Sequence, residues 1–437
     1  MSSSNPTGSV RWSAPRPGRP VHGRVEIPGS KSQTSRALLL AALSGGSASV
    51  TGAPASRDAT LMVDALRALG VSVRVDGTRI TVDGRAGLTG AGTVDCGLAG
   101  TVMRFLPPVA TLADGSVGFD GDPRARERPM GPVLDALRTL GAVIEGDALP
   151  FTVHGDGGLS GGEVILDASA SSQFVSGLLL SGARYDKGVL IRHRSVTGKP
   201  LPSEPHIAMT VDMLRAAHVH VDDAEPNSWR VWPGPVAARD WVIEPDLSNA
   251  AVFLAAAVAT GGQVTVVGWP ARTNQPGVAV LGVLAQFGAT VTPGPEGMTV
   301  SGPAELDGVD VDLHEVGELA PTVAALAALA TGPSRLRGIA HLRGHETDRL
   351  AALAAELTAL GAGATETADG LAISPAALRA VPGRPWRAYA DHRMATAGAL
   401  LGLVVPDLGV DDITCTAKTM PDFARDWTAL VTAPPPT

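Results

Sequence analysis

The chain has 437 residues, of which 44% are hydrophobic, and a formal net charge of −8. This length exceeds the size at which one hydrophobic core usually keeps growing, so we expect two domains. The acidic balance argues against a broad nucleic-acid-binding face, which needs clustered lysine and arginine. Any anionic ligand must therefore meet local positive charge.

The cysteine and hydropathy patterns indicate a soluble cytoplasmic protein. Cys96 and Cys415 lie far apart without a CxxC spacing, so neither a disulfide framework nor a structural zinc site is predicted. The first twenty residues are polar and proline-rich and lack the apolar stretch of a signal peptide. The longest apolar runs, such as 250–259, are about half of what a bilayer span needs, so no membrane association is expected.

An alanine- and leucine-rich helical pattern recurs along the chain, about every 70 residues. Each copy opens with small or polar residues, and the copies begin at Ser30, Gly100, Ser171, Ser248, Glu318 and Asp391. A second pattern follows, which predicts a helix that ends at glycine and runs directly into a strand. This second pattern is found near Asp64, Asp135, Asp212, Val283 and Glu356.

Six such units fit two compact domains of three units each, with 242–246 as a crossover at the midpoint. An open solenoid is less favoured, because solenoid repeats usually run about 20–45 residues and need capping ends. A helix N-terminus exposes unpaired N–H groups and a positive partial charge, which favour anions. If the helix openings converge, they form one electropositive cavity from Lys31, Ser32, Arg36, Thr101, Arg104, Ser171, Ser172, Gln173, Glu318, Asp391, His392 and Arg393.

Two further charged clusters allow a structural interpretation as well as a functional one. Arg124, Arg126 and Arg128 in a proline-rich loop are typical of a solvated turn, and Glu346 with Arg349 is typical of an ion pair on one helix face. The alternative is a site that binds two anions and moves protons between them. Other motifs fail: the GSKS stretch lacks the P-loop spacing, and the i, i+4 histidines lack the pattern of a zinc site.

Seven ordered motifs between Pro28 and Asp422 resemble the 5-enolpyruvylshikimate-3-phosphate (EPSP) synthase family of enolpyruvyl transferases. They are PGSKSQTSRALLLAAL, LAGTVMR, GDPRARERPMG, SSQF, HETDRL, DHRMA and CTAKTMPD. The resemblance implies an α/β fold of two domains, each an inside-out α/β barrel made of three βαβαββ-type units. It further implies that 28–242 form one domain, that 1–27 and 243–437 form the other, and that the active site lies in the cleft between them.

The resemblance also implies the reaction, which is transfer of the enolpyruvyl group of phosphoenolpyruvate to the 5-hydroxyl of shikimate 3-phosphate with release of phosphate. Glu318, Glu346 and Lys31 would be catalytic. The residues expected to bind shikimate 3-phosphate are Lys31, Ser32, Arg36, Ser171, Ser172, Gln173, Ser203, Glu318, His341 and His345. Those expected to bind phosphoenolpyruvate are Lys31, Gly100, Arg128, Gln173, Arg349, Arg393 and Lys418. No metal or other cofactor and no nucleic acid are expected, and the protein is expected to be a monomer.

Some positions depart from the family pattern. Glu318 stands where aspartate is usual, and Phe105 replaces a usual proline. His341, His345 and His206 stand where asparagine, lysine and tyrosine are common, which places groups that titrate near neutrality among the expected substrate contacts. Because Gly100 is not a bulkier residue, we expect glyphosate to inhibit the enzyme.

Two other functions fit parts of the sequence. A UDP-N-acetylglucosamine enolpyruvyl transferase shares the fold and donor, but it typically carries a reactive cysteine in the loop where this chain has Pro123. A non-catalytic module that binds phosphate ligands or RNA ends is disfavoured by the acidic balance and by the paired candidate bases Glu318 and Glu346.

Overall fold

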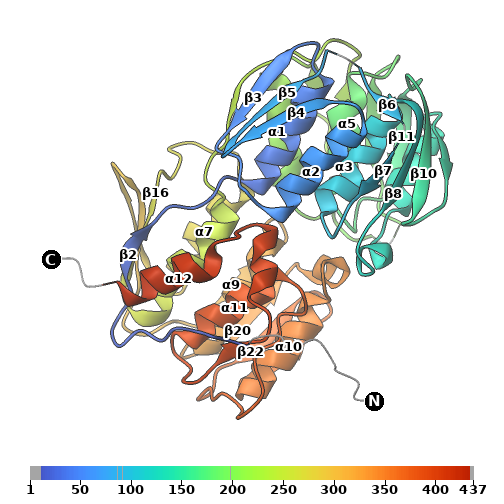
Figure 1. The fold of residues 1–437 in the computed structure, drawn as a ribbon. Coiled ribbons are helices and arrows are strands. Elements are labelled where there is room, and N and C mark those ends of the chain that lie inside the picture. The colour runs from blue at the N-terminus through green and yellow to red at the C-terminus, as the bar shows by residue number, and fades with distance from the viewer. Residues whose placement is uncertain (1–10, 86, 91, 197, 434–437) are drawn as a thin grey trace, which may run out of the picture. The chain divides into compact units, whose positions relative to one another are not determined.

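The computed structural model describes residues 11–85, 87–90, 92–196 and 198–433, and these form two compact units (Figure 1). The first unit contains the described part of Met1–Ile27 together with Leu247–Trp269 and Gly277–Thr437. The second contains Pro28–Asp246 and Pro270–Pro276. Both combine helices with mixed sheets, so the α/β class predicted from the sequence is confirmed.

The second unit is built around helices α1 (Lys31–Leu43), α3 (Gly100–Ala110) and α5 (Gln173–Gly182). Nearly every residue of these helices is buried, polar residues included, so each helix packs against protein on all sides. Figure 1 shows the three helices lying against one another within the strands. Helices α2 (Arg57–Ala68), α4 (Gly131–Thr139) and α6 (Pro205–Ala216) instead have exposed residues along one side.

The sheets of the second unit repeat one strand order. Their described orders are β15-β3-β5-β4, β6-β8-β10-β9 with β7 also on β8, and β11-β12-β14-β13. In each, a parallel pair is extended by antiparallel strands, as the predicted βαβαββ unit requires. The strands are β3 (Ser47–Thr51), β4 (Ser72–Asp76), β5 (Arg79–Asp83), β6 (Thr89–Gly90), β7 (Thr93–Asp95), β8 (Asp114–Asp120), β9 (Val143–Glu145), β10 (Phe151–Asp156), β11 (Gly162–Leu166), β12 (Val189–His193), β13 (Val221–Asp222), β14 (Ser228–Val231) and β15 (Trp241–Val242).

The first unit uses the same plan with a reduced third repeat. Its buried helices are α7 (Leu247–Thr260), α9 (Ala320–Leu329) and α11 (His392–Gly402), and its outer helices are α8 (Val280–Gln286), α10 (Arg349–Leu360) and α12 (Phe423–Thr432). The described sheets are β17-β18-β16-β2, β19-β20-β22-β21 and the short β1-β23. Their strands are β1 (Trp12–Ser13), β2 (His22–Val25), β16 (Gln263–Val267), β17 (Thr290–Gly294), β18 (Gly297–Ser301), β19 (Asp310–Asp312), β20 (Ser334–Arg337), β21 (Gly363–Glu366), β22 (Leu371–Ser374) and β23 (Gly409–Val410).

Two strands belong to a different unit from the helix that follows them in the chain. Strand β2 precedes α1 in the chain but pairs in parallel with β16 of the first unit. Strand β15 precedes α7 but pairs in parallel with β3 of the second unit. The chain therefore passes from one unit to the other shortly after each of these strands.

Left-handed residues follow the outer helices α2, α4, α6, α8 and α10, and here one sequence expectation was wrong. Gly70, Gly141, Gly288 and Gly361 have φ values of 79°, 108°, 92° and 107°, as helix-capping glycines require. The copy near Asp212 carries no glycine, and His218 takes the corresponding position with a φ of 62°. The repeat thus depends on the backbone conformation rather than on glycine itself.

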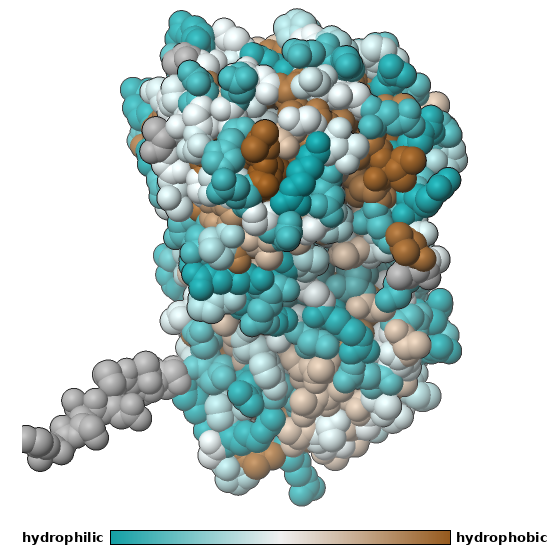
Figure 2. All heavy atoms as spheres, turned by 90° about the vertical axis from the view of Figure 1, so that its right-hand side faces the viewer, coloured by the Kyte–Doolittle hydropathy of each residue, from teal (hydrophilic) through white to brown (hydrophobic). Residues whose placement is uncertain are grey.

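The described residues include no helix long and apolar enough to cross a membrane. On the face in Figure 2, hydrophilic side chains separate the hydrophobic ones. Large hydrophobic residues exposed in the described chain are mostly single valines, for example Val75, Val143 and Val196, and such scattered residues need no partner.

Candidate active site

The first predicted site residues of the second unit lie at the start of α1. Ser30 caps the helix by accepting a hydrogen bond from the backbone N–H of Gln33. The ammonium of Lys31 lies 3.3 Å from the carboxylate of Asp58, which is in the first turn of α2 and 1% exposed. Lys31 is therefore held by a buried carboxylate from another helix.

Arg36 is a buried cation whose hydrogen bonds in the described chain go to neutral oxygens. Its guanidinium donates to the Thr210 hydroxyl at 2.7 Å and to the carbonyls of Ser32 and His206, each at 3.0 Å. The guanidinium carbon lies 5.1 Å from the centre of the Phe105 ring, within cation–π range. Burial lowers the pKa of Arg36 to about 9, which still leaves it charged at neutral pH. An incoming anion would supply the opposite charge.

Gly100 begins α3 in a tight polar enclosure. An added Cβ would lie 2.9 Å from the side-chain oxygen of Gln173, and 3.1 Å and 3.2 Å from the guanidiniums of Arg128 and Arg104. Arg104 also donates to the Gln173 oxygen at 2.8 Å, and its guanidinium stacks over Phe174 at 5.3 Å. Two arginines thus face a position with no side chain, which suits an anion.

The remaining candidates of the second unit lie at the openings of α5 and α6. Ser172 is the N-cap residue of α5, and the Ser171 hydroxyl accepts from the backbone N–H of Gln173 at 3.3 Å. Ser203 precedes α6 with a φ of 53°, and its carbonyl accepts from the N–H of His206 at 3.1 Å. The structure therefore places Ser203 one turn away from the His206 carbonyl that holds Arg36.

The first unit gathers its candidates around two buried carboxylates, of which Glu346 is the first. One oxygen of Glu346 contacts the Lys418 ammonium, and the other lies 3.1 Å from the Arg349 guanidinium. Glu346, Lys418 and Arg349 are all buried. A carboxylate between two cations in a low-dielectric site is well placed to exchange a proton with a ligand that the cations bind.

Asp391 is the second carboxylate and was not among the predicted substrate-binding or catalytic residues. It caps α11 by accepting from the N–H of Arg393 at 2.9 Å, and both its oxygens accept from Arg349, at 2.8 and 3.1 Å. Burial opposes the charge on Arg349, but the carboxylates of Asp391 and Glu346 outweigh it and raise the pKa of Arg349. Asp391 therefore joins two predicted phosphoenolpyruvate ligands.

Glu318 lies in a short 3-10 turn, Gly317–Leu319, immediately before α9. Its carboxylate accepts from the Ser248 hydroxyl at 3.1 Å, and the Ser248 carbonyl in turn accepts from Arg393. The openings of α7, α9 and α11 are thus connected through Ser248, which was predicted only as the start of a helix pattern.

The sequence of one protein family matches this chain almost from end to end. The profile of EPSP synthase (3-phosphoshikimate 1-carboxyvinyltransferase) matches residues 15–427. The chain belongs to the EPSP synthase family. The resemblance inferred from the seven motifs is therefore confirmed.

Solved structures agree with the family match. An EPSP synthase from Acinetobacter baumannii is 25% identical, with a TM-score of 0.76 over 95% of this chain and 96% of that one. A second EPSP synthase structure from the same organism is 26% identical, with a TM-score of 0.74 over 93% of this chain and 96% of that one. The enolpyruvyl transferase NikO from Streptomyces tendae is 19% identical with a TM-score of 0.72 over 95% and 96%, which supports the fold alone.

The interpretation of the proline-rich loop as a solvated turn holds for two of its three arginines. Arg124 and Arg126 form ion pairs with Glu127 and Asp120 at the surface, so these two arginines belong to a solvated turn. Arg128, from the same loop, is buried and directs its guanidinium toward Gly100. The alternation of outward and inward side chains in this loop is not visible from composition.

Two of the substituted histidines, His341 and His345, lie near Arg349, and His341 also lies near Glu318. The rings of His314 and His345 lie 6.2 and 5.8 Å from that of His341. Burial, followed by the neighbouring His314, lowers the pKa of His341 to about 4. His341 is therefore neutral near pH 7 and contributes no titration there, contrary to the sequence expectation for this position.

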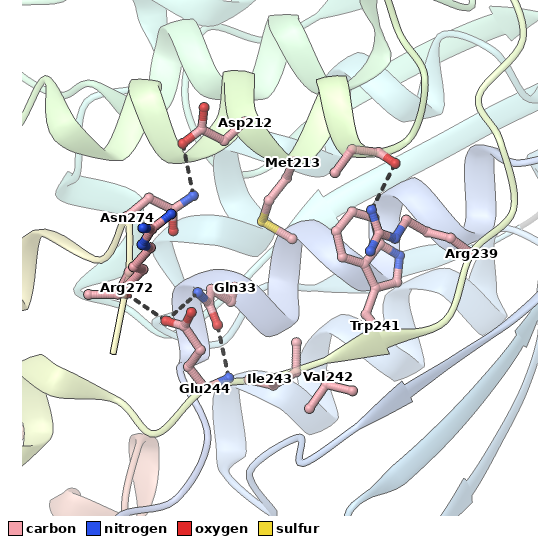
Figure 3. Close-up of a pocket in the computed structure, with 12 residues that line it drawn as sticks. Gln33, Asp212, Met213, Arg239, Trp241, Val242, Ile243, Glu244, Arg272 and Asn274 are labelled. Atoms are coloured by element: carbon pink, nitrogen blue, oxygen red, sulfur yellow. Dashed lines mark hydrogen bonds between the residues drawn. The ribbon is translucent and has the colours of Figure 1, made fainter. Parts of the chain in front are cut away.

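The described second unit also contains an open cavity of about 490 Å³, between α6, β15 and residues 270–276 (Figure 3). Its polar groups satisfy one another: Asn274 donates to Asp212 at 3.1 Å, and Gln33 and Thr273 donate to Glu244. None of the predicted site residues lines this cavity, so it is separate from the candidate site.

Replacing Gly100 by alanine should weaken phosphoenolpyruvate and glyphosate binding. The methyl group must displace the Gln173 and Arg128 groups that enclose Gly100. We expect KM for phosphoenolpyruvate to rise about tenfold, with KM for shikimate 3-phosphate within about twofold of wild type. Steady-state kinetics at saturating second substrate checks this, with Gly282→Ala as control because nothing lies within 4 Å of its added methyl group. Unchanged inhibition of Gly100→Ala by glyphosate would contradict the assignment.

Proposed function

We propose that the polar groups of the two units act on one pair of substrates. The chain is a 3-phosphoshikimate 1-carboxyvinyltransferase: it transfers the enolpyruvyl group of phosphoenolpyruvate to the 5-hydroxyl of shikimate 3-phosphate in the shikimate pathway. The enclosure of Gly100 by Arg128, Arg104 and Gln173 carries the proposal for the residues, because it offers cationic donors where no side chain intrudes. Action in the cytoplasm and as a monomer is part of the proposal.

The cations neutralise the substrates. Shikimate 3-phosphate and phosphoenolpyruvate together bring two phosphates and two carboxylates, whose mutual repulsion must be offset before they can react. In the proposal shikimate 3-phosphate is held by Lys31, Ser32, Arg36, Ser171, Ser172, Gln173 and Ser203 of the second unit and by Glu318, His341 and His345 of the first. Phosphoenolpyruvate is held by Lys31, Gly100, Arg128 and Gln173 of the second unit and by Arg349, Arg393 and Lys418 of the first.

The carboxylates move the protons. Glu318 accepts the proton of the 5-hydroxyl while the hydroxyl oxygen adds to the central carbon of phosphoenolpyruvate. Glu346, with Lys31, delivers a proton to the methylene carbon. The product of this addition is a tetrahedral intermediate. Loss of phosphate, which takes up the proton that Glu318 accepted, and return of a methyl proton to Glu346 give 5-enolpyruvylshikimate 3-phosphate. Arg349 and Lys418 contact the two oxygens of Glu346 and hold its carboxylate in place.

Phosphate release tests the function directly. Purified protein receives phosphoenolpyruvate with shikimate 3-phosphate in one tube and with UDP-N-acetylglucosamine in another. Release only with shikimate 3-phosphate is expected. Release only with the sugar nucleotide would assign the sister activity, and binding of shikimate 3-phosphate without release would support a non-catalytic ligand-binding role.

Removing the carboxylate of Glu318 tests the proposed base. Glu318→Gln should lower kcat by about 100-fold or more, because general base catalysis typically contributes 10²–10⁴-fold. Glu318→Asp, which restores the family's usual residue, should recover part of the rate. Glu315→Gln is the matched control, since Glu315 is an exposed carboxylate in the same segment. A kcat of Glu318→Gln within threefold of wild type would remove Glu318 from the mechanism.

A further inference from the structure

A fully buried carboxylate lies in α10 outside the groups that the proposed mechanism uses. Glu356 is 0% exposed and belongs to the same helix as Arg349. A buried charge is costly unless it is paired and hydrogen-bonded, so the partners of such a residue indicate its role.

The Glu356 carboxylate binds one loop of the described chain, 384–389. One carboxylate oxygen accepts from the Arg384 guanidinium and from the Tyr389 hydroxyl, each at 2.8 Å. The other accepts from the backbone N–H of Arg387 at 3.3 Å. Burial, followed by the Glu356 carboxylate, raises the pKa of Tyr389, which keeps the phenol protonated as a donor. Glu356 thus binds three points of the loop.

This loop leads into Asp391 through an unfavourable backbone conformation. Tyr389 and Ala390 both have a φ of 54°, in the left-handed region that residues with a Cβ seldom adopt. Such residues persist only where surrounding contacts enforce them. The Arg387 guanidinium, 4.9 Å from the Tyr389 ring, adds a further contact to the hydrogen bonds from Glu356. The loop conformation is therefore maintained from α10.

The same helix meets the loop a second time at the active site. Arg349, the first residue of α10, donates to both oxygens of Asp391, which directly follows the left-handed pair. Asp391 also fixes the N–H of Arg393. From this arrangement we infer that Glu356 is a positioning residue: by fixing the 384–390 loop, it sets Asp391 and thereby orients Arg349 and Arg393 toward phosphoenolpyruvate. The inference rests on the proposed function.

Full-length Glu356→Gln tests this inference by steady-state kinetics. The amide keeps the size of the side chain but loses the charge that orders Arg384, and it accepts fewer hydrogen bonds. We expect KM for phosphoenolpyruvate to rise about tenfold. KM for shikimate 3-phosphate should stay within about twofold, because its proposed contacts Lys31, Ser32 and Arg36 lie in the other unit and are unchanged. Loss of stability alone would lower the active fraction and leave both KM values unchanged.

Tyr389→Phe keeps the inference testable if Glu356→Gln does not fold. It removes one hydrogen bond to Glu356 and should raise KM for phosphoenolpyruvate about threefold, with an effect that is not additive in the double variant. Asp310→Asn, which breaks an exposed pair with Arg337 in the same unit, is the control and should change neither KM.

Unchanged KM for phosphoenolpyruvate in Tyr389→Phe, and in Glu356→Gln where that variant folds, would overturn the inference, as would an equal rise in both KM values. Failure of the proposed function is seen separately, because wild-type protein would then release no phosphate with shikimate 3-phosphate.

Discussion

Glu346→Gln should lower kcat by about 100- to 10,000-fold, the range that general acid–base groups contribute. The substitution preserves the size of a buried side chain but removes the group that gives and takes the proton at the methylene carbon. It also leaves Lys418 and Arg349 facing a neutral amide, which can neither give nor accept that proton. Steady-state kinetics at saturating substrates measures the effect.

Isotope exchange separates the proton-transfer role from a binding role. With shikimate 3-phosphate in deuterium oxide, wild-type enzyme should incorporate deuterium at the methylene carbon of phosphoenolpyruvate. This exchange is expected if the addition that forms the intermediate is reversible. Glu346→Gln should bind both substrates and lose this exchange. Glu366→Gln removes a surface carboxylate paired with Arg343 in the same unit and should retain it. Normal exchange in Glu346→Gln would assign the proton to another group, with Lys31 the next candidate.

The second large effect concerns stability. Asp391→Ala should destabilise the protein by about 3–5 kcal/mol, the usual cost of removing one partner of a buried ion pair. Arg349 is 2% exposed and Asp391 0% exposed, so water cannot replace the lost carboxylate at the Arg349 guanidinium. Asp391 also caps α11. Urea unfolding at several wavelengths measures the change and shows whether the two units unfold together.

A second substitution separates the effect of losing the charge from the effect of losing the helix cap. Asp391→Asn keeps an oxygen that can cap α11 but loses the charge that faces Arg349. Its free energy of unfolding should therefore exceed that of Asp391→Ala, while its binding of phosphoenolpyruvate should still be weak. Asp310→Ala, at an exposed ion pair of the same unit, should leave the unfolding midpoint unchanged. A midpoint for Asp391→Ala equal to that of wild type would show that Arg349 does not depend on Asp391.

The sequence by itself determined the repeated architecture and the family. Helix periodicity, polar helix openings and the helix-to-strand pattern are local features, and all depend on neighbours a few residues apart. They therefore predicted the buried helices α1, α3, α5, α7, α9 and α11, and the seven motifs identified the reaction. Local patterns also gave Ser30 and Asp391 as helix openings, since capping requires only the next three residues.

Only the tertiary structure decided which charges face each other. Asp58 looks like an ordinary acidic residue in a first helical turn, and its contact with Lys31 arises because two helices pack together. The pairing of Asp391 with Arg349, the outward turn of Arg126 beside an inward Arg128, and the low pKa of His341 likewise depend on residues distant in sequence. Burial and electrostatic interaction are properties of the folded surroundings, so residue type and spacing do not specify them.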